Sequence, residues 1–263
     1  MKRLFIFGLG YSAARIALAA EAKGWEVVST GRAGTLAFDD TGSVRMALAD
    51  SAQVLSSVPP GGDGDPVLNC YGDALSGKGL TYLSSTGVYG DTGGAWVDES
   101  APTGTGRRTA RSEADATWLA HDARVLRLPG IYGPGRSALE RVHEGTARRI
   151  NLPGQVFSRV HVDDIVSGAL LALDAAPGAY NLADDEPCSQ NAVIEEACRL
   201  LGAALPPLQS LEEAQLSPMA RAFYAENRRV ANGKARRDLR WQPRYPSYRE
   251  GLAALAAAGE RDQ

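Results

Sequence analysis

The N-terminal stretch constrains the fold of this chain more than any other. Residues 2–7 read KRLFIF and lead directly into GLGYSA at residues 8–13. Apolar residues then recur at helical spacing over residues 11–23, Gly24 follows, and residues 25–30 read WEVVST. Because the first run is too short for a helix, this order predicts a buried strand, a tight turn, a helix that ends at Gly24 and a second strand.

The residues of the turn suit a bound pyrophosphate. Gly8 permits a backbone angle closed to other residues, Gly10 lets the anion approach the main chain, and the small Ala13 lets helix and strand pack closely. Free N–H groups at the start of the helix, at Tyr11 and Ser12, face the anion. Together these features predict a dinucleotide site, and the alternative is a glycine turn in another kind of α/β protein.

Arg32 follows the second strand, at the position that most informs cofactor choice. An acidic residue there would accept hydrogen bonds from the adenosine ribose, whereas an arginine can pair with a 2′-phosphate. Arg32 therefore favours NADP over NAD, and the alternative is a surface arginine in a loop.

Strands and helices alternate along the next hundred residues. Strands are expected at residues 36–39, 53–58, 80–84 and 124–128, and helices at 44–49, 65–75 and 109–120. This alternation predicts an α/β fold with a doubly wound, Rossmann-type parallel sheet over residues 1–145. Ligands bind at the C-terminal edge of such sheets. The loops there are expected to contribute cofactor contacts from Ser57, Val58, Pro59, Pro129 and Ile131.

The remaining residues, 146–263, are expected to form a smaller, mainly helical substrate lobe, with room for the chain to cross between the lobes. Helices are expected at residues 162–173, 191–201 and 248–258, and a strand at 179–182. Asp163 or Asp164 is expected to cap the first of these helices. The substrate should lie between the two lobes, beside the nicotinamide.

Composition describes an ordinary cytoplasmic protein. The chain has 263 residues, a net charge of -3 and 22% charged residues. Its three cysteines lack metal-ligand spacing, and no stretch reaches the ~18 apolar residues of a membrane span. Paired arginines could suggest nucleic-acid binding, but the acidic net charge and the absence of interleaved aromatics argue against it. We therefore expect no metal, no membrane and no nucleic-acid partner.

Four further motifs follow the glycine turn. They read SSTGVYG at residues 84–90, RLPGIYGPG at 127–135, RVHVDD at 159–164 and YNLAD at 180–184. In this order they resemble the extended short-chain dehydrogenases/reductases, the NAD-dependent epimerase/dehydratase superfamily, over nearly the whole chain. The resemblance implies a Rossmann fold that binds NAD or NADP, and it implies homodimers formed through two helices, here at residues 65–75 and 109–120.

The resemblance also implies a catalytic trio that this chain has only in part. In the family a Ser or Thr orients the substrate, a Tyr moves the proton, and a Lys four residues later lowers the pKa of that Tyr and holds the cofactor ribose. Ser85 matches the hydroxyl position. Thr109 and Glu113 occupy the Tyr and Lys positions, or Ala110 and Ala114 in an alignment without a gap. The chain is thus identified as an atypical member without the usual pair.

Tyr89 is the second catalytic candidate, because it follows Ser85 on a loop at the ligand edge of the sheet. Positive charge near the missing lysine would come from Arg107, Arg108 or Arg111. The alternative for Tyr89 is a packing role in the core.

Substrate contacts are assigned to Tyr132 and Arg159, and Ser84 is expected beside the cofactor. By resemblance, the position of Arg159 in sugar-nucleotide epimerases reaches the substrate phosphate, and a guanidinium suits bidentate phosphate recognition. A structural salt bridge is the alternative for Arg159.

Two functions follow from these observations. The first is an NAD(P)-dependent oxidoreductase or epimerase of atypical mechanism, acting on a small carbonyl or sugar-nucleotide-like substrate. The second is a non-catalytic NADP-binding protein with a redox-sensing or regulatory role. The retained Ser85 and Arg159 favour the first, and the missing Tyr and Lys favour the second.

Overall fold

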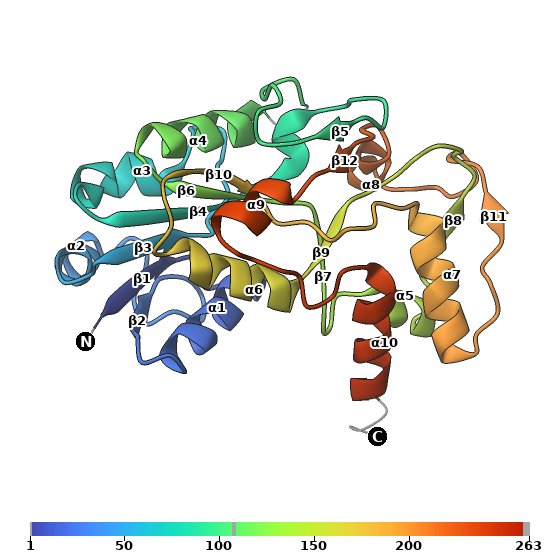
Figure 1. Ribbon diagram of the computed structural model, residues 1–263, viewed down its shortest axis with the longest axis horizontal. Coiled ribbons are helices and arrows are strands. Elements are labelled where there is room, and N and C mark those ends of the chain that lie inside the picture. The colour runs from blue at the N-terminus through green and yellow to red at the C-terminus, as the bar shows by residue number, and fades with distance from the viewer. Residues whose placement is uncertain (1, 107–108, 260–263) are drawn as a thin grey trace.

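The computed structural model describes residues 2–106 and 109–259. Its main feature is a six-stranded parallel sheet with the strand order β10-β6-β4-β3-β1-β2 (Figure 1). The Rossmann-type parallel sheet predicted from the alternating pattern is thereby confirmed. The six strands are β1 (Arg3–Phe7), β2 (Glu26–Ser29), β3 (Gln53–Ser56), β4 (Gly79–Ser85), β6 (Arg124–Leu128) and β10 (Gly178–Asn181).

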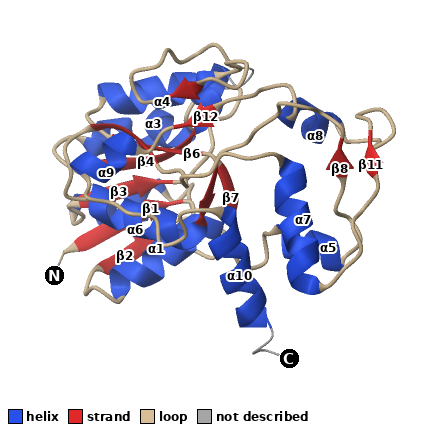
Figure 2. Ribbon diagram, turned by 45° about the vertical axis from the view of Figure 1, so that its right-hand side comes forward, coloured by secondary structure: helices blue, strands red, loops and turns tan. Residues whose placement is uncertain are grey.

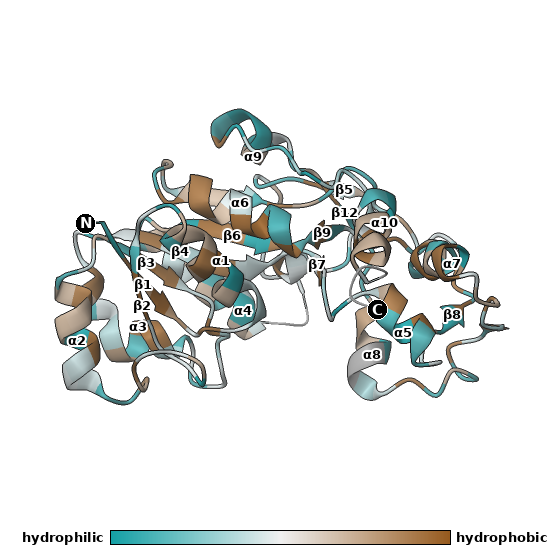
Figure 3. Cartoon of the chain, turned by 90° about the horizontal axis from the view of Figure 1, so that it is seen from below, coloured by the Kyte–Doolittle hydropathy of each residue, from teal (hydrophilic) through white to brown (hydrophobic). Residues whose placement is uncertain are grey.

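Helices cover both faces of this sheet, which is why β1 reads as a continuous apolar run. Leu4 and Ile6 pack with α1 (Tyr11–Glu21) and α6 (Val162–Ala172) on one face. Phe5 and Phe7 belong to a second core on the other face. The strands of the sheet carry the brown of apolar residues in Figure 3, whereas α9 (Gly233–Asp238) is largely teal. The second core also includes residues of α2 (Thr41–Ala49), α3 (Pro66–Tyr71) and α4 (Thr109–Ala120).

The strand predicted at residues 36–39 is wrong. Leu36 makes only an isolated bridge with Thr30. Phe38 turns inward instead, and its ring lies 6.1 Å from that of Phe7 and 5.4 Å from that of Tyr71. These aromatic contacts hold the segment against the core although it does not pair with the sheet. No strand therefore forms between β2 and α2.

The strand expected at residues 179–182 in the small lobe lies in the main sheet instead. It is β10, and it pairs in parallel with β6, with Ala179 opposite Val125. Tyr180 and Leu182 join the core that also contains α1 and α6. Burial of these apolar side chains returns the chain to the main sheet, whereas a domain boundary near residue 145 stays a prediction.

The small lobe lies to one side of the sheet (Figure 2). Residues of α5 (Ala138–His143), α7 (Gln190–Leu201) and α10 (Tyr248–Gly259) share one apolar cluster. Within the described residues, no helix is long and apolar enough to cross a membrane. The other elements are α8 (Pro218–Phe223), the 3-10 helices η1 (Gly72–Leu75) and η2 (Thr86–Tyr89), and the strand pairs β5 (Trp96–Val97) with β12 (Arg229–Val230), β7 (Gly130–Tyr132) with β9 (Arg159–His161), and β8 (Arg149–Ile150) with β11 (Leu208–Gln209).

Candidate functional site

A cavity of about 450 Å³ lies at the C-terminal edge of the main sheet. It is bounded by the first turn of α1, the loop after β3, the ends of β4 and β6, and segments of the C-terminal half. The residues of the sequence prediction that line this cavity are Gly10, Tyr11, Ser12, Ala13, Ser57, Ser84, Ser85, Pro129 and Ile131.

Gly8 holds the turn before this cavity and does not line it. Its φ is 81°, and a Cβ atom there would lie 2.9 Å from Val58 Cγ2. The Gly8 N–H donates to Thr30 Oγ1 at 3.2 Å, and Ser57 Oγ donates to the Gly8 carbonyl. Gly8 and Val58 therefore lie against each other and neither lines the cavity, because the close approach of the two loops leaves no room for a side chain at Gly8.

Gly10 has no side chain, so the start of α1 is accessible from the cavity. It is the N-cap residue and provides no side-chain cap. A Cβ atom at Gly10 would meet no protein atom within 4 Å. The N–H groups of Tyr11, Ser12 and Ala13 have no protein acceptor among the described residues. Three free donors at the positive end of a helix dipole suit an anion, so these residues fit the pyrophosphate of a dinucleotide.

Arg32 and Pro59 are exposed and lie outside the lining of the cavity. Arg32 makes no hydrogen bond or ion pair within residues 2–106 and 109–259. The assignment of Arg32 to a 2′-phosphate therefore stays a prediction.

The two serines at the end of β4 both face the cavity, with different partners. Ser84 Oγ donates to Asp115 Oδ2 at 2.6 Å, so its proton is directed into the protein. Ser85 Oγ accepts the N–H of Gly87 at 3.1 Å and caps η2. Because the Ser85 proton has no acceptor in the described part of the chain, this hydroxyl can donate to a ligand.

Asp115 is a buried residue that the sequence analysis missed. Arg127 donates to its two carboxylate oxygens from Nε at 3.1 Å and from Nη2 at 2.7 Å. Asp115 lies one helical turn after Arg111 on α4, and this spacing was the signal that both residues share a face. The ion pair of Asp115 with Arg127 fixes the position of Ser84.

Tyr89 does not line either cavity. Its side chain is 2% exposed, its hydroxyl donates to Asn181 Oδ1 at 2.8 Å, and it accepts from Arg127 Nη1 at 3.0 Å. Burial raises the pKa of this phenol. The catalytic role expected for Tyr89 thus has no support in the geometry, because η2 turns the ring towards β6 and β10.

Arg111, on α4, lines the cavity with its positively charged side chain. Its Nη1 donates to the Tyr82 hydroxyl at 2.7 Å, and burial raises the pKa of Tyr82 to about 12. Glu113 is exposed, on the outer side of the helix. Arg107 and Arg108 lie outside the described residues.

A second cavity, of about 430 Å³, contains the two predicted substrate residues, Tyr132 and Arg159. It adjoins the first, and residues that include Ile131, Phe157 and Phe223 line both. The Tyr132 hydroxyl donates to the Ser247 carbonyl at 3.4 Å, and burial raises its pKa.

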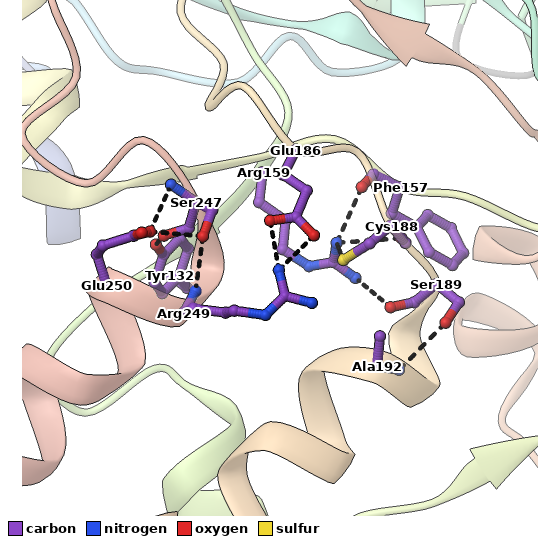
Figure 4. Close-up of polar contacts among 10 residues, drawn as sticks. All are labelled: Tyr132, Phe157, Arg159, Glu186, Cys188, Ser189, Ala192, Ser247, Arg249 and Glu250. Carbon is purple, nitrogen blue, oxygen red and sulfur yellow. Dashed lines mark hydrogen bonds and ion pairs between the residues drawn. The ribbon is translucent and has the colours of Figure 1, made fainter.

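Arg159 is turned into the wall of this second cavity (Figure 4). Its Nη1 donates to the carbonyls of Phe157 at 2.9 Å and Cys188 at 3.2 Å, and its Nη2 donates to the Ser189 carbonyl at 3.3 Å. It forms no salt bridge within the described chain, so the alternative of a structural ion pair is wrong. Most of its donors serve neutral protein groups, which leaves few for a substrate phosphate.

Asp184, Asp164 and His161 belong to two of the motifs singled out in the sequence. Both Asp184 oxygens are buried without a hydrogen-bond partner among the described residues, and burial raises the pKa of Asp184 to about 8. Asp164 does not cap α6: it accepts the N–H groups of Arg244 and Tyr245, and burial raises its pKa to about 6. His161 Nδ1 is the cap acceptor instead. Within the described residues, no group of three metal-ligating side chains is present.

No family model matches the chain. A conserved protein of unknown function from Silicibacter pomeroyi DSS is 39% identical, and the match covers 99% of this chain and 100% of that one with a TM-score of 0.87. Protein YeeZ of Escherichia coli K12 is 28% identical over 80% of this chain and 88% of its own length. A 3-diazoavenalumate denitrifying reductase from Streptomyces is 36% identical over 49% of this chain, and the match spans 45% of the reductase.

More distant structures share the fold. A dTDP-glucose 4,6-dehydratase from Bacillus anthracis in complex with NAD is 14% identical, with a TM-score of 0.76 over 100% of this chain and 97% of that one. A human epimerase family protein with NADPH is 16% identical, with a TM-score of 0.77 over 97% and 99% of the two chains. The chain therefore belongs to the same family as the Silicibacter protein and has the fold of the extended short-chain dehydrogenases/reductases, the NAD-dependent epimerases and dehydratases.

Proposed function

We propose that the protein is an NAD(P)H-dependent oxidoreductase that acts on a small carbonyl or sugar-nucleotide-like substrate. The observation that carries the proposal is a single cavity that joins the bare start of α1 to the Ser85 hydroxyl. Gly10, Tyr11, Ser12 and Ala13 would hold the pyrophosphate, and Pro129 would lie beside the nicotinamide. The likeness to a reductase over half of the chain supports this class of reaction.

The proposed chemistry does not use the usual Tyr and Lys. A bound NADPH would supply a hydride to the carbonyl carbon of the substrate. The Ser85 hydroxyl is free to donate a hydrogen bond to the carbonyl oxygen, and the Arg111 guanidinium lines the same cavity. A donor and a positive charge stabilise the oxyanion that develops there. The proton that completes the alcohol comes from water.

Gly10→Val tests the cofactor site. The side chain would project into the cavity without touching the protein, so the variant should fold and melt like the wild type while losing at least tenfold in NADPH affinity by isothermal titration calorimetry. Gly62→Val is the matched control, because a Cβ there also meets no atom but lies outside the cavity. Equal NADPH affinity in Gly10→Val and wild type would overturn the site.

The same titrations test cofactor choice. If Arg32 pairs with the 2′-phosphate, Arg32→Ala should lose roughly tenfold in affinity for NADPH and little for NADH. Equal losses for both cofactors would contradict the preference for NADP.

A non-catalytic NADP-binding sensor is the second candidate, favoured by the burial of Tyr89 away from both cavities. Oxidation of NADPH in the presence of carbonyl substrates distinguishes the two functions. In an enzyme, Ser85→Ala should lower turnover and leave NADPH affinity unchanged. Tight NADPH binding without turnover of any carbonyl compound would favour the sensor.

A further inference from the structure

The second cavity carries an excess of positive charge. Arg136, Arg141 and Arg159 line it, together with Glu140 and Glu144. The Glu140 carboxylate accepts the N–H groups of Gly135 and Ser137 at the start of α5, and its charge also acts on Arg141. Glu144 is exposed at the other end of α5. The lining therefore has three arginines and two acids, an excess of one positive charge.

Arg141, like Arg136, is a cation of the lining with hydrogen-bond donors to spare. Its guanidinium makes no hydrogen bond or ion pair with the described residues. Arg141 is an exposed residue at the edge of the cavity. Partial desolvation there and the charge of Arg159 lower its pKa, whereas the charges of Tyr224 and Glu140 raise it. Two guanidinium groups thus face one space, and an anion between them would relieve their repulsion.

Arg159 gives the cavity a positive charge but few free hydrogen-bond donors. Its donors are taken by the carbonyls of the wall, and none of those partners is ionised. Asp184 is the acid whose charge acts on Arg159, and burial raises its pKa to about 8. The raised pKa of Asp184 weakens its neutralisation of Arg159 as pH falls below about 8. Gln190 Nε2, a further donor in the lining residues, has no acceptor among the described residues.

Much of the rest of the wall is apolar. Phe157, Phe223, Val193, Tyr248 and Leu252 line the space, and Ser137 and Ser158 add polar side chains to it. The apolar part of this wall suits a flat hydrophobic body. The cavity continues into the cofactor cavity past Ile131, so a ligand anchored here can reach Ser85.

We propose that this cavity binds the carboxylate of a compact aromatic acid, with Arg141 as the residue that pairs with it. The proposal rests on the proposed function, because it names the substrate class of the same enzyme. The reacting carbonyl would lie at the other end of the molecule, towards Ser85. Recognition would thus be by a single carboxylate and an apolar ring, without a nucleotide.

The experiment uses cinnamate, cinnamamide and UDP as probes, titrated into the full chain with saturating NADPH. Cinnamate should bind, and cinnamamide, which has the same shape without the charge, should bind at least tenfold more weakly. Arg141→Gln should weaken cinnamate at least tenfold and leave NADPH affinity unchanged. Arg148→Gln is the control, because Arg148 is exposed in the same lobe and does not line the cavity.

Each contrary result has a distinct meaning. Equal binding of cinnamate and cinnamamide, or full binding by Arg141→Gln, overturns the role of Arg141. Binding of UDP but not cinnamate, lost in Arg141→Gln, overturns the aromatic acid in favour of a nucleotide. Failure of both cinnamate and UDP to bind would also contradict the proposal. Failure of NADPH itself to bind the wild type would be the failure of the proposed function, and the direct titration of NADPH detects it separately.

Discussion

At the scale of single residues, two buried acids of this protein have different surroundings. Asp115 is paired with Arg127 at 2.7 Å, whereas Asp184 has no hydrogen-bond partner for either oxygen among the described residues. Burial favours the neutral form of a carboxyl and raises the pKa of Asp184 to about 8, although the charge of Arg159 and the nearby backbone N–H groups of Glu186 and Arg159 favour the ionised form. The same residue type therefore forms a buried ion pair at one position and has a raised pKa at the other.

Asp184→Asn should flatten the pH dependence of stability. The folded protein holds the Asp184 proton up to about pH 8, and the unfolded chain releases it near pH 4. The stabilising effect of that proton is complete below the unfolded pKa and is lost as pH rises to the folded pKa. The wild type should lose up to about 1.4 kcal/mol of unfolding free energy per pH unit in this window from Asp184 alone.

Chemical denaturation between pH 5 and 8 measures this loss. Asp174→Asn, which changes an exposed carboxyl just after α6, is the control and should keep the wild-type slope. A wild-type slope in Asp184→Asn would show that Asp184 is ionised in the folded protein.

At the scale of elements, Asp65 joins two helices on one face of the sheet. One carboxylate oxygen caps α3 by accepting the N–H groups of Val67 and Leu68. The other accepts the indole N–H of Trp118, on α4, at 2.9 Å. A single buried side chain thus satisfies donors of both elements.

Asp65→Ala should lower the unfolding free energy by about 2–4 kcal/mol, because it removes a helix cap and leaves the buried Trp118 N–H without an acceptor. Asp40→Ala, which removes the exposed cap of α2, should cost less. Urea denaturation followed by tryptophan fluorescence compares the two. Equal losses would mean that the contact with Trp118 contributes nothing.

At the scale of the whole molecule, the proposed cofactor cavity is closed by segments far apart in sequence. Gly10 and Ser85 line it from the sheet, and Phe223 and Arg228 line it from the C-terminal half. Arg228 Nη1 also donates to the Gly90 carbonyl at 2.6 Å. A ligand in this cavity would therefore hold the two parts together.

Cofactor should protect the segment around α8 from trypsin. Arg221 is exposed there, and cleavage needs the segment to leave the cavity wall. NADPH at about ten times its Kd should slow cleavage after Arg221 about tenfold. Gly10→Val should show no protection. Unchanged cleavage at saturating NADPH would show that this segment does not take part in binding.

Local patterns determined the parts of this protein that neighbouring residues build together. The turn at Gly8 and Gly10, the helix after it and the alternation of strands with helices all follow from spacing within about thirty residues, and the structure has them. The cavity likewise brings together the glycine turn with Ser84 and Ser85, because parallel strands end at one edge of a sheet.

Tertiary structure decided the direction of the side chains. Tyr89 points to Asn181, 92 residues away, and Arg159 donates to the carbonyl of Cys188, so neither partner could be read from local sequence. The free guanidinium of Arg141 likewise depends on which walls close around it. Sequence by itself determined the framework of the glycine turn and the parallel sheet, since it depends on local spacing. Only the packing of distant segments decided which charged groups bind other protein groups and which remain free for a ligand.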